Sequence, residues 1–298
     1  MKVTPYVVTD VFTGIALKGN SLAVVLDGTA LTTEQMQAVA REFNLSETTF
    51  MVRRDAAVER SEGVRVRIFT TQEELNFAGH PTLGTASVLR ELAPELVQDQ
   101  TVTLALNVGS VPVRFQSEGS FGTMTQKDPT FGAELDPQAV AAFTGLPVEA
   151  IDAAHPPRVV STGTAFAIVL LNSADSLAHL RVQHPEATPW LREAGARWFY
   201  VLAPTGEIAA SGEREFRARM QFYGGEDPAT GSAAGCAISF LVETGVVASG
   251  ERILVRQGVE IERPSELFLS AKRELSRVTD VRVGGSTVLV AKGQLFLP

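Results

Sequence analysis

The sequence predicts an α+β protein made of two related halves, and three observations lead to this class. Short runs typical of strands outnumber helical runs, and they lack the regular strand–helix alternation of a doubly wound sheet. The motif HPTLGTA at residues 80–86 recurs as DPATGSA at residues 227–233, half a chain length later. The 298 residues are 45% hydrophobic and 20% charged, an ordinary globular composition that can supply two cores.

Helices are predicted where apolar residues recur at helical spacing. Thr32 and Gln35 have the spacing of a capping box, and the apolar residues between Met36 and Phe43 then share one helical face. Two surface helices are expected at residues 137–143 and 188–196. Strands are expected where apolar residues alternate or cluster between turns. These strands lie at residues 22–26, 64–68, 102–106, 111–115, 122–126, 166–171, 198–202, 216–222, 253–257, 267–271, 278–283 and 287–291.

The internal repeat extends beyond the two seven-residue motifs. Upstream of the first motif, RVRIF at residues 65–69 resembles RARMQF at residues 217–222. Each half therefore combines a strand, a loop, the pattern X-Pro-x-x-Gly-[Thr/Ser]-Ala and an apolar helix. Two matches in the same order predict two homologous halves, and the repeat alone favours a junction around residues 175–189.

The two copies of the motif are candidates for binding an anion. His80 and Asp227 each precede a proline, which favours the first helical position, so Asp227 is an expected N-cap and His80 a less usual one. The small residues that follow leave backbone N–H groups unshielded at the positive end of a helix dipole. Such a helix start can bind a carboxylate or stabilise an oxyanion. A purely structural capping role remains the alternative.

Glu47 is the candidate acid/base residue. It lies between Ser46 and Thr48 at the expected entry of a half-buried strand, with Leu45 and Phe50 just beyond. A carboxyl group in such surroundings can have a raised pKa and serve as a general base. A solvated glutamate at a strand end remains the alternative.

Charge and cysteine content exclude several classes of function. The net charge of −8 without a basic stripe argues against nucleic acid and acidic membrane surfaces as partners. The single cysteine, Cys236, excludes an internal disulfide, a cysteine-rich zinc site and two-thiol chemistry. We find no dinucleotide, phosphate-loop or metal-binding motif, so no cofactor or metal is expected. No secretory signal or apolar run of membrane length is evident, so a soluble, cytoplasmic protein is expected.

Three segments resemble the phenazine-biosynthesis PhzF-like isomerase family of the diaminopimelate-epimerase-like superfamily. They are LSET at residues 45–48, FAGHPTLGTA at residues 77–86 and EDPATGSA at residues 226–233. The resemblance implies two pseudo-symmetric epimerase-like domains, each a curled, mostly antiparallel sheet around a central helix. The expected domains are residues 1–125 and 126–280, with residues 281–298 as a C-terminal strand able to pack back on the first domain. Members are often homodimers that need no cofactor or metal, so a homodimer is expected here.

The resemblance also implies a function and a set of site residues. Glu47 would be the acid/base that moves a proton between carbons of a small cyclic or amino-acid-like carboxylate, of the trans-2,3-dihydro-3-hydroxyanthranilate type, in the interdomain cleft. His80 and Asp227 would be its polar catalytic partners. The expected substrate-binding residues are Asn20, Gly79, Gly231 and Ser232.

Two departures from the family pattern and one alternative function accompany this resemblance. Ser21 stands where a proline is common, and Glu262 stands where a glycine is common. Both would affect loop shape rather than the acid/base residues, and hence the choice of substrate. The alternative function is a non-catalytic protein that binds small acids or other partners and retains the fold.

Overall fold

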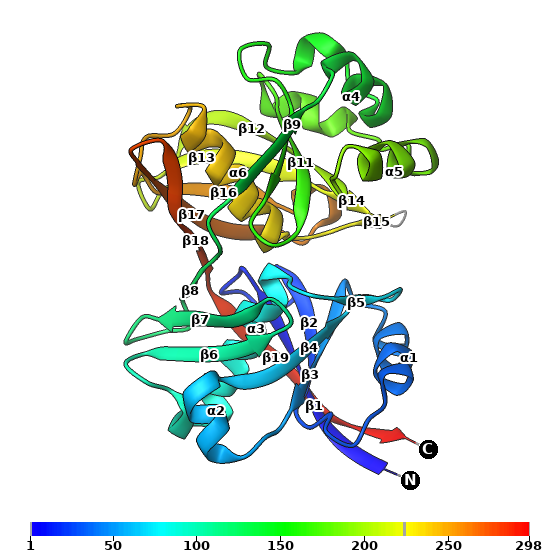
Figure 1. Cartoon of the computed structure of the whole chain (residues 1–298), viewed down its shortest axis with the longest axis vertical. Coiled ribbons are helices and arrows are strands. Elements are labelled where there is room, and N and C mark those ends of the chain that lie inside the picture. The colour runs from blue at the N-terminus through cyan, green and yellow to red at the C-terminus, as the bar shows by residue number, and fades with distance from the viewer. Residues whose placement is uncertain (1, 223–224, 298) are drawn as a thin grey trace. The chain divides into compact units, whose positions relative to one another are not determined.

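The chain divides into two compact units, each with its own set of curled strands. The computed structural model describes residues 2–222 and 225–297. Unit 1 comprises residues 1–125 and 284–298, and unit 2 comprises residues 126–283 (Figure 1). A junction around residues 175–189 is wrong, because these residues form a 3-10 turn and a helix inside unit 2. The repeat offset measures the distance between equivalent motifs and does not locate the boundary between the units.

Unit 1 is a curled, mostly antiparallel sheet. Its main strands follow the order β19-β1-β2-β3-β4-β6-β7-β8, with the short β5 paired to β4. Only β2–β3 and β4–β6 are parallel among the pairings described for this unit. The strands are β1 (Lys2–Val11), β2 (Asn20–Val25), β3 (Glu47–Val52), β4 (Val64–Phe69), β5 (Glu74–Leu75), β6 (Thr101–Leu106), β7 (Gly109–Phe115), β8 (Gly122–Thr125) and β19 (Thr287–Leu297). The helices are α1 (Thr33–Phe43), α2 (Ala56–Glu62) and α3 (Gly79–Leu92).

The strands of unit 2 are arranged in the same curled, mostly antiparallel way. Its main strands follow the order β9-β10-β11-β12-β13-β16-β17-β18, and β14 pairs with β15 in a separate two-stranded ribbon. The strands are β9 (Thr130–Glu134), β10 (Arg158–Ser161), β11 (Ala165–Leu170), β12 (Trp198–Ile208), β13 (Arg214–Arg219), β14 (Gln221–Phe222), β15 (Gly225–Glu226), β16 (Ile253–Gln257), β17 (Ser265–Glu274) and β18 (Arg277–Gly285). The helices are α4 (Pro137–Thr144), α5 (His184–Glu193) and α6 (Gly231–Glu243).

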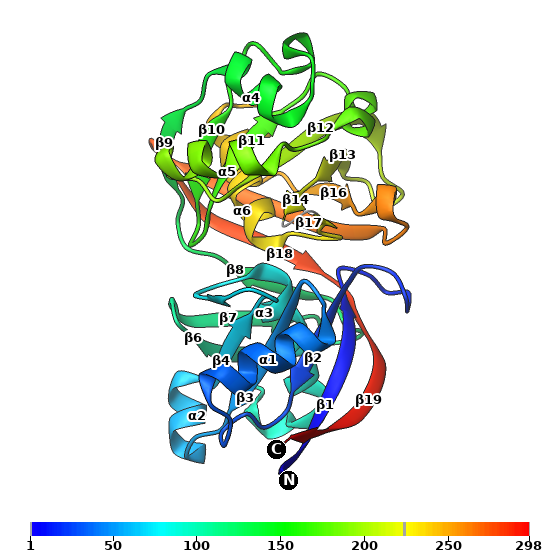
Figure 2. The same cartoon turned by 90° about the vertical axis from the view of Figure 1, so that its right-hand side faces the viewer.

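The two units repeat one another in topology. In unit 2, β11–β12 and β13–β16 are parallel, exactly as β2–β3 and β4–β6 are in unit 1. A parallel pair needs a crossover connection, and each unit makes these crossovers with one outer helix and one central helix. The outer helices are α1 and α5, and the central ones are α3 and α6 (Figure 2). The predicted class of two pseudo-symmetric α+β domains is confirmed.

The central helices are buried because their sequences are apolar and small on all sides. In α6 every residue from Gly231 to Val242 is buried, and in α3 the first eight residues are buried. A helix that is apolar all round belongs inside its unit, whereas α1 buries only the stripe with Met36, Val39 and Ala40. Each central helix therefore carries its N-terminal residues into the interior of its own sheet. No helix among the described residues has the length and apolar character to cross a membrane.

Several predicted elements differ from the observed ones. The helix expected at residues 188–196 runs from His184 to Glu193, because Pro185 supports the first turn and the chain continues through Pro189. The strand expected at residues 216–222 is split after Arg219. Strand β1 was not predicted, and it contains Pro5. Pro5 lies at the end of the β1–β2 ladder, where its carbonyl oxygen accepts from the Leu26 N–H, so its missing N–H affects only the end of that ladder.

Candidate active site

Unit 1 brings three predicted polar site residues together. Asn20 is the first residue of β2 and Glu47 is the first residue of β3. These strands are parallel, with Leu22 opposite Glu47, so both side chains start at the same edge of the sheet. His80 is the second residue of α3 and is 2% exposed. A carboxyl, an amide and an imidazole therefore meet at the buried start of the central helix.

The hydrogen bond from Asn20 determines which nitrogen of His80 carries the proton. The Asn20 amide nitrogen lies 3.2 Å from His80 Nδ1 and can only donate, so Nδ1 accepts. Burial lowers the pKa of His80 to about 3, so the ring is neutral at physiological pH. Its proton is then on Nε2, a buried atom without a hydrogen-bond partner among the described residues. The ring thus presents one uncharged donor.

Glu47 Oε2 lies 3.5 Å from His80 Nδ1. This contact is not an ion pair, because the histidine is neutral. A carboxylate oxygen and an unprotonated ring nitrogen are both acceptors, and Nδ1 already accepts from Asn20, so the ring does not donate to Glu47 through this nitrogen. The geometry suits a carboxyl group that gains and loses a proton beside a fixed imidazole.

The surroundings of this cluster are held by short polar contacts. Asp10 accepts a hydrogen bond from the Ser21 hydroxyl at 2.6 Å and another from the Leu17 backbone N–H. Gly19 has a positive φ of 67°, and a Cβ there would lie 2.4 Å from the Val11 carbonyl oxygen. The chain that delivers Asn20 therefore requires glycine before it.

The start of α3 differs from the predicted capping pattern. Ala78 is the N-cap and provides no side-chain cap, so His80 is not a cap. Gly79 is the first helical residue, and Pro81 occupies the third position rather than the first. Proline lacks the N–H that would be unsatisfied there, so Gly79 and His80 supply the N–H groups that have no intrahelical acceptor.

Unit 2 places the other three predicted residues at the start of α6. Gly231 and Ser232 are the first two residues of this helix and are buried. Asp227 is not the N-cap, because that position belongs to Thr230. Instead, Asp227 Oδ2 accepts a 2.6 Å hydrogen bond from the Thr230 hydroxyl. The motif thus forms a short loop before the helix in unit 2, whereas its equivalent in unit 1 is already helical.

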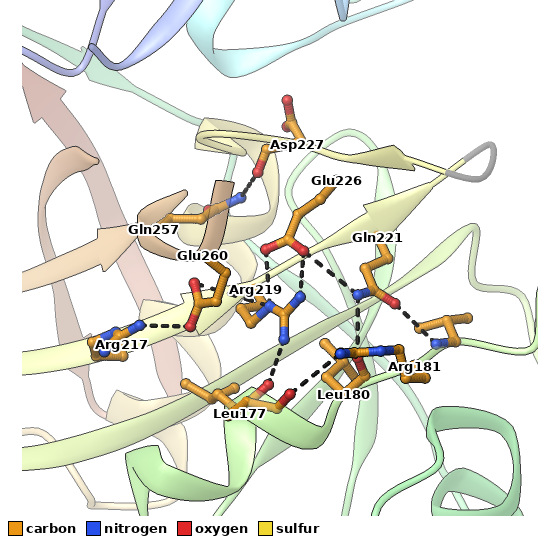
Figure 3. A network of polar contacts seen from close by, with 12 residues as sticks. Leu177, Leu180, Arg181, Arg217, Arg219, Gln221, Glu226, Asp227, Gln257 and Glu260 are labelled. Carbon is orange, nitrogen blue, oxygen red and sulfur yellow. Dashed lines mark hydrogen bonds and ion pairs between the residues drawn. The ribbon is translucent and has the colours of Figure 1, made fainter. Parts of the chain in front are cut away.

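Gln257, Thr230 and Tyr200 were not singled out as functional residues from the sequence. Gln257 is the last residue of β16 and bonds the Asp227 carbonyl oxygen at 2.8 Å (Figure 3). It also bonds Thr230 and the Tyr200 hydroxyl. In the sequence, Thr230 lies within the second motif and Gln257 precedes a glycine at the end of an expected strand, but neither signal identifies the partners.

Thiol and metal chemistry find no support among the described residues. Burial raises the pKa of the Cys236 thiol to about 11, which leaves it protonated and unreactive. No group of three or more His, Cys, Asp and Glu side chains in the described ranges is placed to hold a metal ion.

Comparison with known proteins identifies the family. The family model described as phenazine biosynthesis-like protein matches residues 9–293. The chain belongs to this family. Trans-2,3-dihydro-3-hydroxyanthranilate isomerase of Pseudomonas aeruginosa is 35% identical to this PhzF-family chain, over 98% of the chain and 99% of the relative. An uncharacterized isomerase of Mesorhizobium japonicum is 34% identical over the full length of both proteins. By this relationship, the PhzF-family chain is an isomerase.

Solved structures agree with the family and the fold. A predicted epimerase from Pseudomonas aeruginosa is 36% identical, with a TM-score of 0.82 over 99% of the PhzF-family chain and 100% of the other. A hydroxyproline epimerase from Agrobacterium vitis is only 11% identical, with a TM-score of 0.63 over 99% and 91% of the two chains. The second likeness shows that the fold is shared with amino-acid epimerases, and it shows nothing further.

Proposed function

We propose that this protein moves a proton between two carbons of a small cyclic or amino-acid-like carboxylate, with Glu47 as the acid/base. The observation that carries the proposal is the buried contact of Glu47 Oε2 with His80 Nδ1, beside the Asn20 amide. A single carboxyl group that accepts a proton from one carbon and returns it to another needs no second base.

The chemistry of His80 supports a role in stabilising charge. When Glu47 removes a proton from carbon, the electron pair left behind delocalises into the conjugated acid. A neutral imidazole with its proton on Nε2 can donate to such a developing charge, and its low pKa keeps it from competing for the proton. Asn20 then acts by holding the ring and its tautomer, in addition to its proposed contact with substrate.

The helix starts support a carboxylate substrate. Gly79 in α3, and Gly231 with Ser232 in α6, occupy the first turns of buried helices. Backbone N–H groups there and the helix dipole favour a bound carboxylate and the negative charge that spreads onto it. The proposed substrate class is therefore that of trans-2,3-dihydro-3-hydroxyanthranilate, which a relative with 35% identity isomerises according to its name.

Asp227 completes the proposal as a polar partner from unit 2. The internal repeat pairs Asp227 with His80, and each lies immediately upstream of, or within, the first turn of a central helix. We propose that the two residues act on one substrate. In one version Asp227 assists the proton transfer by Glu47, and in a second it acts as a base from the opposite face.

Proton exchange in heavy water tests the proposal. Wild type, Glu47→Gln and the control Glu42→Gln are incubated with trans-2,3-dihydro-3-hydroxyanthranilate and followed by NMR and ultraviolet absorbance. Glu42 is an exposed residue of α1, so its substitution makes the same chemical change outside the site. Glu47→Gln is expected to lose about 10²- to 10⁴-fold in rate, whereas Glu42→Gln keeps the wild-type rate.

The label distribution separates the possible mechanisms. Partial retention of the original proton in the product supports return by the same carboxyl group, and complete exchange supports two bases. Ligand binding with no exchange in the wild type would instead favour a non-catalytic small-acid binding protein. Equal rates in wild type and Glu47→Gln would overturn the role of Glu47.

A further inference from the structure

The loop that carries Asp227 is held by one fully buried side chain. Gln257 is 0% exposed and sits where β16 ends, next to residues 227–230. Its amide nitrogen donates to the Asp227 carbonyl oxygen at 2.8 Å and to Thr230 Oγ1 at 2.9 Å. Its amide oxygen accepts from the Thr230 backbone N–H and from the Tyr200 hydroxyl, both at 3.1 Å. All four hydrogen-bonding positions of the amide are used.

The chemistry of these partners fixes which group donates and which accepts in each hydrogen bond of the network. A backbone N–H can only donate and a backbone carbonyl can only accept, so the Gln257 amide cannot be turned over. Because Thr230 Oγ1 accepts from Gln257, its own proton is left for another acceptor. That acceptor is Asp227 Oδ2, 2.6 Å away. The hydrogen bonds therefore run from Gln257 through Thr230 to the Asp227 carboxylate.

Two further contacts fix the ends of the loop. Gly258 has a φ of 74°, and a Cβ there would lie 2.7 Å from the Pro228 carbonyl oxygen, so the two backbones pack directly against each other. At the other end, Glu226 pairs with the buried Arg219, whose Nε lies 2.9 Å from Glu226 Oε1 (Figure 3). Burial is the largest single effect and opposes the charge on Arg219, but the hydrogen bond to Glu226 and the charges of Glu226 and Glu260 together outweigh it and raise the pKa of Arg219.

We propose that Gln257 is a positioning residue for Asp227 and acts through the Thr230 hydroxyl. Gln257 holds the Asp227 main chain directly, and by donating to Thr230 it directs the threonine proton onto the Asp227 carboxylate. This inference rests on the proposed function, in which Asp227 works on the substrate.

Substitutions that keep shape but change hydrogen bonding test the inference. Thr230→Val removes the hydroxyl, Gln257→Glu removes the amide donors, and Thr230→Ser restores the hydroxyl. Thr144→Val is the matched control, because this buried threonine of unit 2 donates to the Val140 carbonyl at 2.7 Å in another helix. Melting temperatures confirm that each variant is folded.

With trans-2,3-dihydro-3-hydroxyanthranilate as the probe, Thr230→Val and Gln257→Glu are expected to lower kcat by about 10- to 100-fold. KM is expected to change by less than about threefold, because the loss concerns a group that acts in the transition state. Thr230→Ser and Thr144→Val are expected to stay within about threefold of wild-type kcat. A general loss of packing would not be rescued by serine.

Crystal structures of the Thr230 variants give a readout that does not depend on turnover. The inference requires that the Asp227 carboxylate change its side-chain rotamer in Thr230→Val and keep its wild-type position in Thr230→Ser. An unmoved carboxylate in Thr230→Val overturns it, as does wild-type kcat in both Thr230→Val and Gln257→Glu. Asp227→Asn with wild-type activity would overturn the role of Asp227 and this inference together. Loss of activity in Asp227→Asn with none in the other two overturns this inference alone.

Discussion

At the scale of single residues, burial decides the protonation state of His80. The ring is 2% exposed, and burial alone lowers its pKa from the ordinary 6.5 to about 3. Charging it would require removing a cation from water without a compensating hydrogen bond on Nε2. The residue is thus kept as a neutral donor over the whole physiological range of pH.

This shift predicts a pH dependence of stability. Between pH 6.5 and 3 the unfolded state binds a proton on His80 that the folded state does not, so the free energy of unfolding falls as the pH falls. The His80 contribution has a slope of at most about 1.4 kcal/mol per pH unit in this range and vanishes above pH 7. Urea unfolding of wild type and His80→Gln at several pH values measures it. Curves that stay parallel from pH 7.5 to 4.5 would contradict the prediction.

The two departures from the family pattern, Glu262 and Ser21, each have a local structural effect. Glu262 has a φ of 59°, so the position that is commonly glycine has a left-handed backbone. A non-glycine residue there carries a strain of about 1 kcal/mol. Ser21, where a proline is common, donates its hydroxyl proton to Asp10, an interaction that proline cannot make. Each departure therefore has a local structural consequence.

At the scale of elements, Gly84 of the first motif is explained by close packing. Exposure of backbone N–H groups at the helix start does not explain it, because Gly84 is not in the first turn of α3. Gly84 lies within α3, not at its start. A Cβ on Gly84 would lie 2.7 Å from Leu22 Cδ2 and 2.7 Å from Val11 Cγ2. The central helix can therefore approach β1 and β2 only with a glycine at this position, and this approach helps to set the distance of α3 from the sheet edge that carries Asn20.

Gly84→Ala is expected to destabilise unit 1 despite the better helix propensity of alanine. Propensity favours alanine by about 1 kcal/mol, whereas overpacking a buried contact costs about 1–3 kcal/mol. The clash involves two buried side chains from neighbouring strands, so we expect a net loss of up to about 2 kcal/mol. Thermal and urea unfolding measure this change. Gly14→Ala is the control, because nothing lies within 4 Å of a Cβ there. A Gly84→Ala protein as stable as the wild type would contradict this expectation and show that the Leu22 and Val11 side chains can move aside at little cost.

At the scale of the whole molecule, unit 1 is assembled from both ends of the chain. Strand β19 pairs with β1 along its length, from Lys2 opposite Leu297 to Val11 opposite Thr287. Leu295 and Leu297 pack against the core of unit 1 around Met36 and Phe50. In unit 2, one cluster of buried apolar residues lies between residues 135 and 203. Each unit thus has a hydrophobic core of its own.

Because β19 belongs to unit 1, we expect charged substitutions in this strand to lower the stability of unit 1 and to leave that of unit 2 unchanged. Replacing Leu295 and Leu297 with aspartate places two charges against the unit 1 core, which costs at least about 2 kcal/mol. Phe296→Asp is the control, since Phe296 is 61% exposed. Both tryptophans, Trp190 and Trp198, lie in unit 2, so their fluorescence reports on that unit. In the double aspartate variant we expect the unfolding transition seen by tryptophan fluorescence to be unchanged. The backbone amides of unit 1 are expected to lose their protection from hydrogen exchange under milder conditions than in the wild type. A shifted fluorescence transition would show that the units unfold together.

Much of the fold was predictable because hydrophobic periodicity and the repeat are local properties of the chain. Apolar helices occur at both motifs, as expected, and most strands lie where alternating residues indicated them. The helix starts were not predictable in the same way. Pro81 is the third helical residue and Pro228 precedes α6, although the two prolines occupy the same place in the repeat. Hydrogen bonds from distant Gln257 hold the second motif as a loop, and sequence spacing carries no information about such a partner.

The sequence by itself determined the α+β class, the doubled architecture, the family and the identity of Glu47, His80 and Asp227 as candidate residues. These properties follow from residue types and their spacing along the chain. The tertiary structure alone decided that Asn20 binds His80 Nδ1, that the histidine is neutral, and that Gln257 acts on the Asp227 loop. The physical reason is that burial and hydrogen-bond direction depend on partners 30 to 60 residues away, and only the folded sheet brings these partners within 3 Å or so of each other.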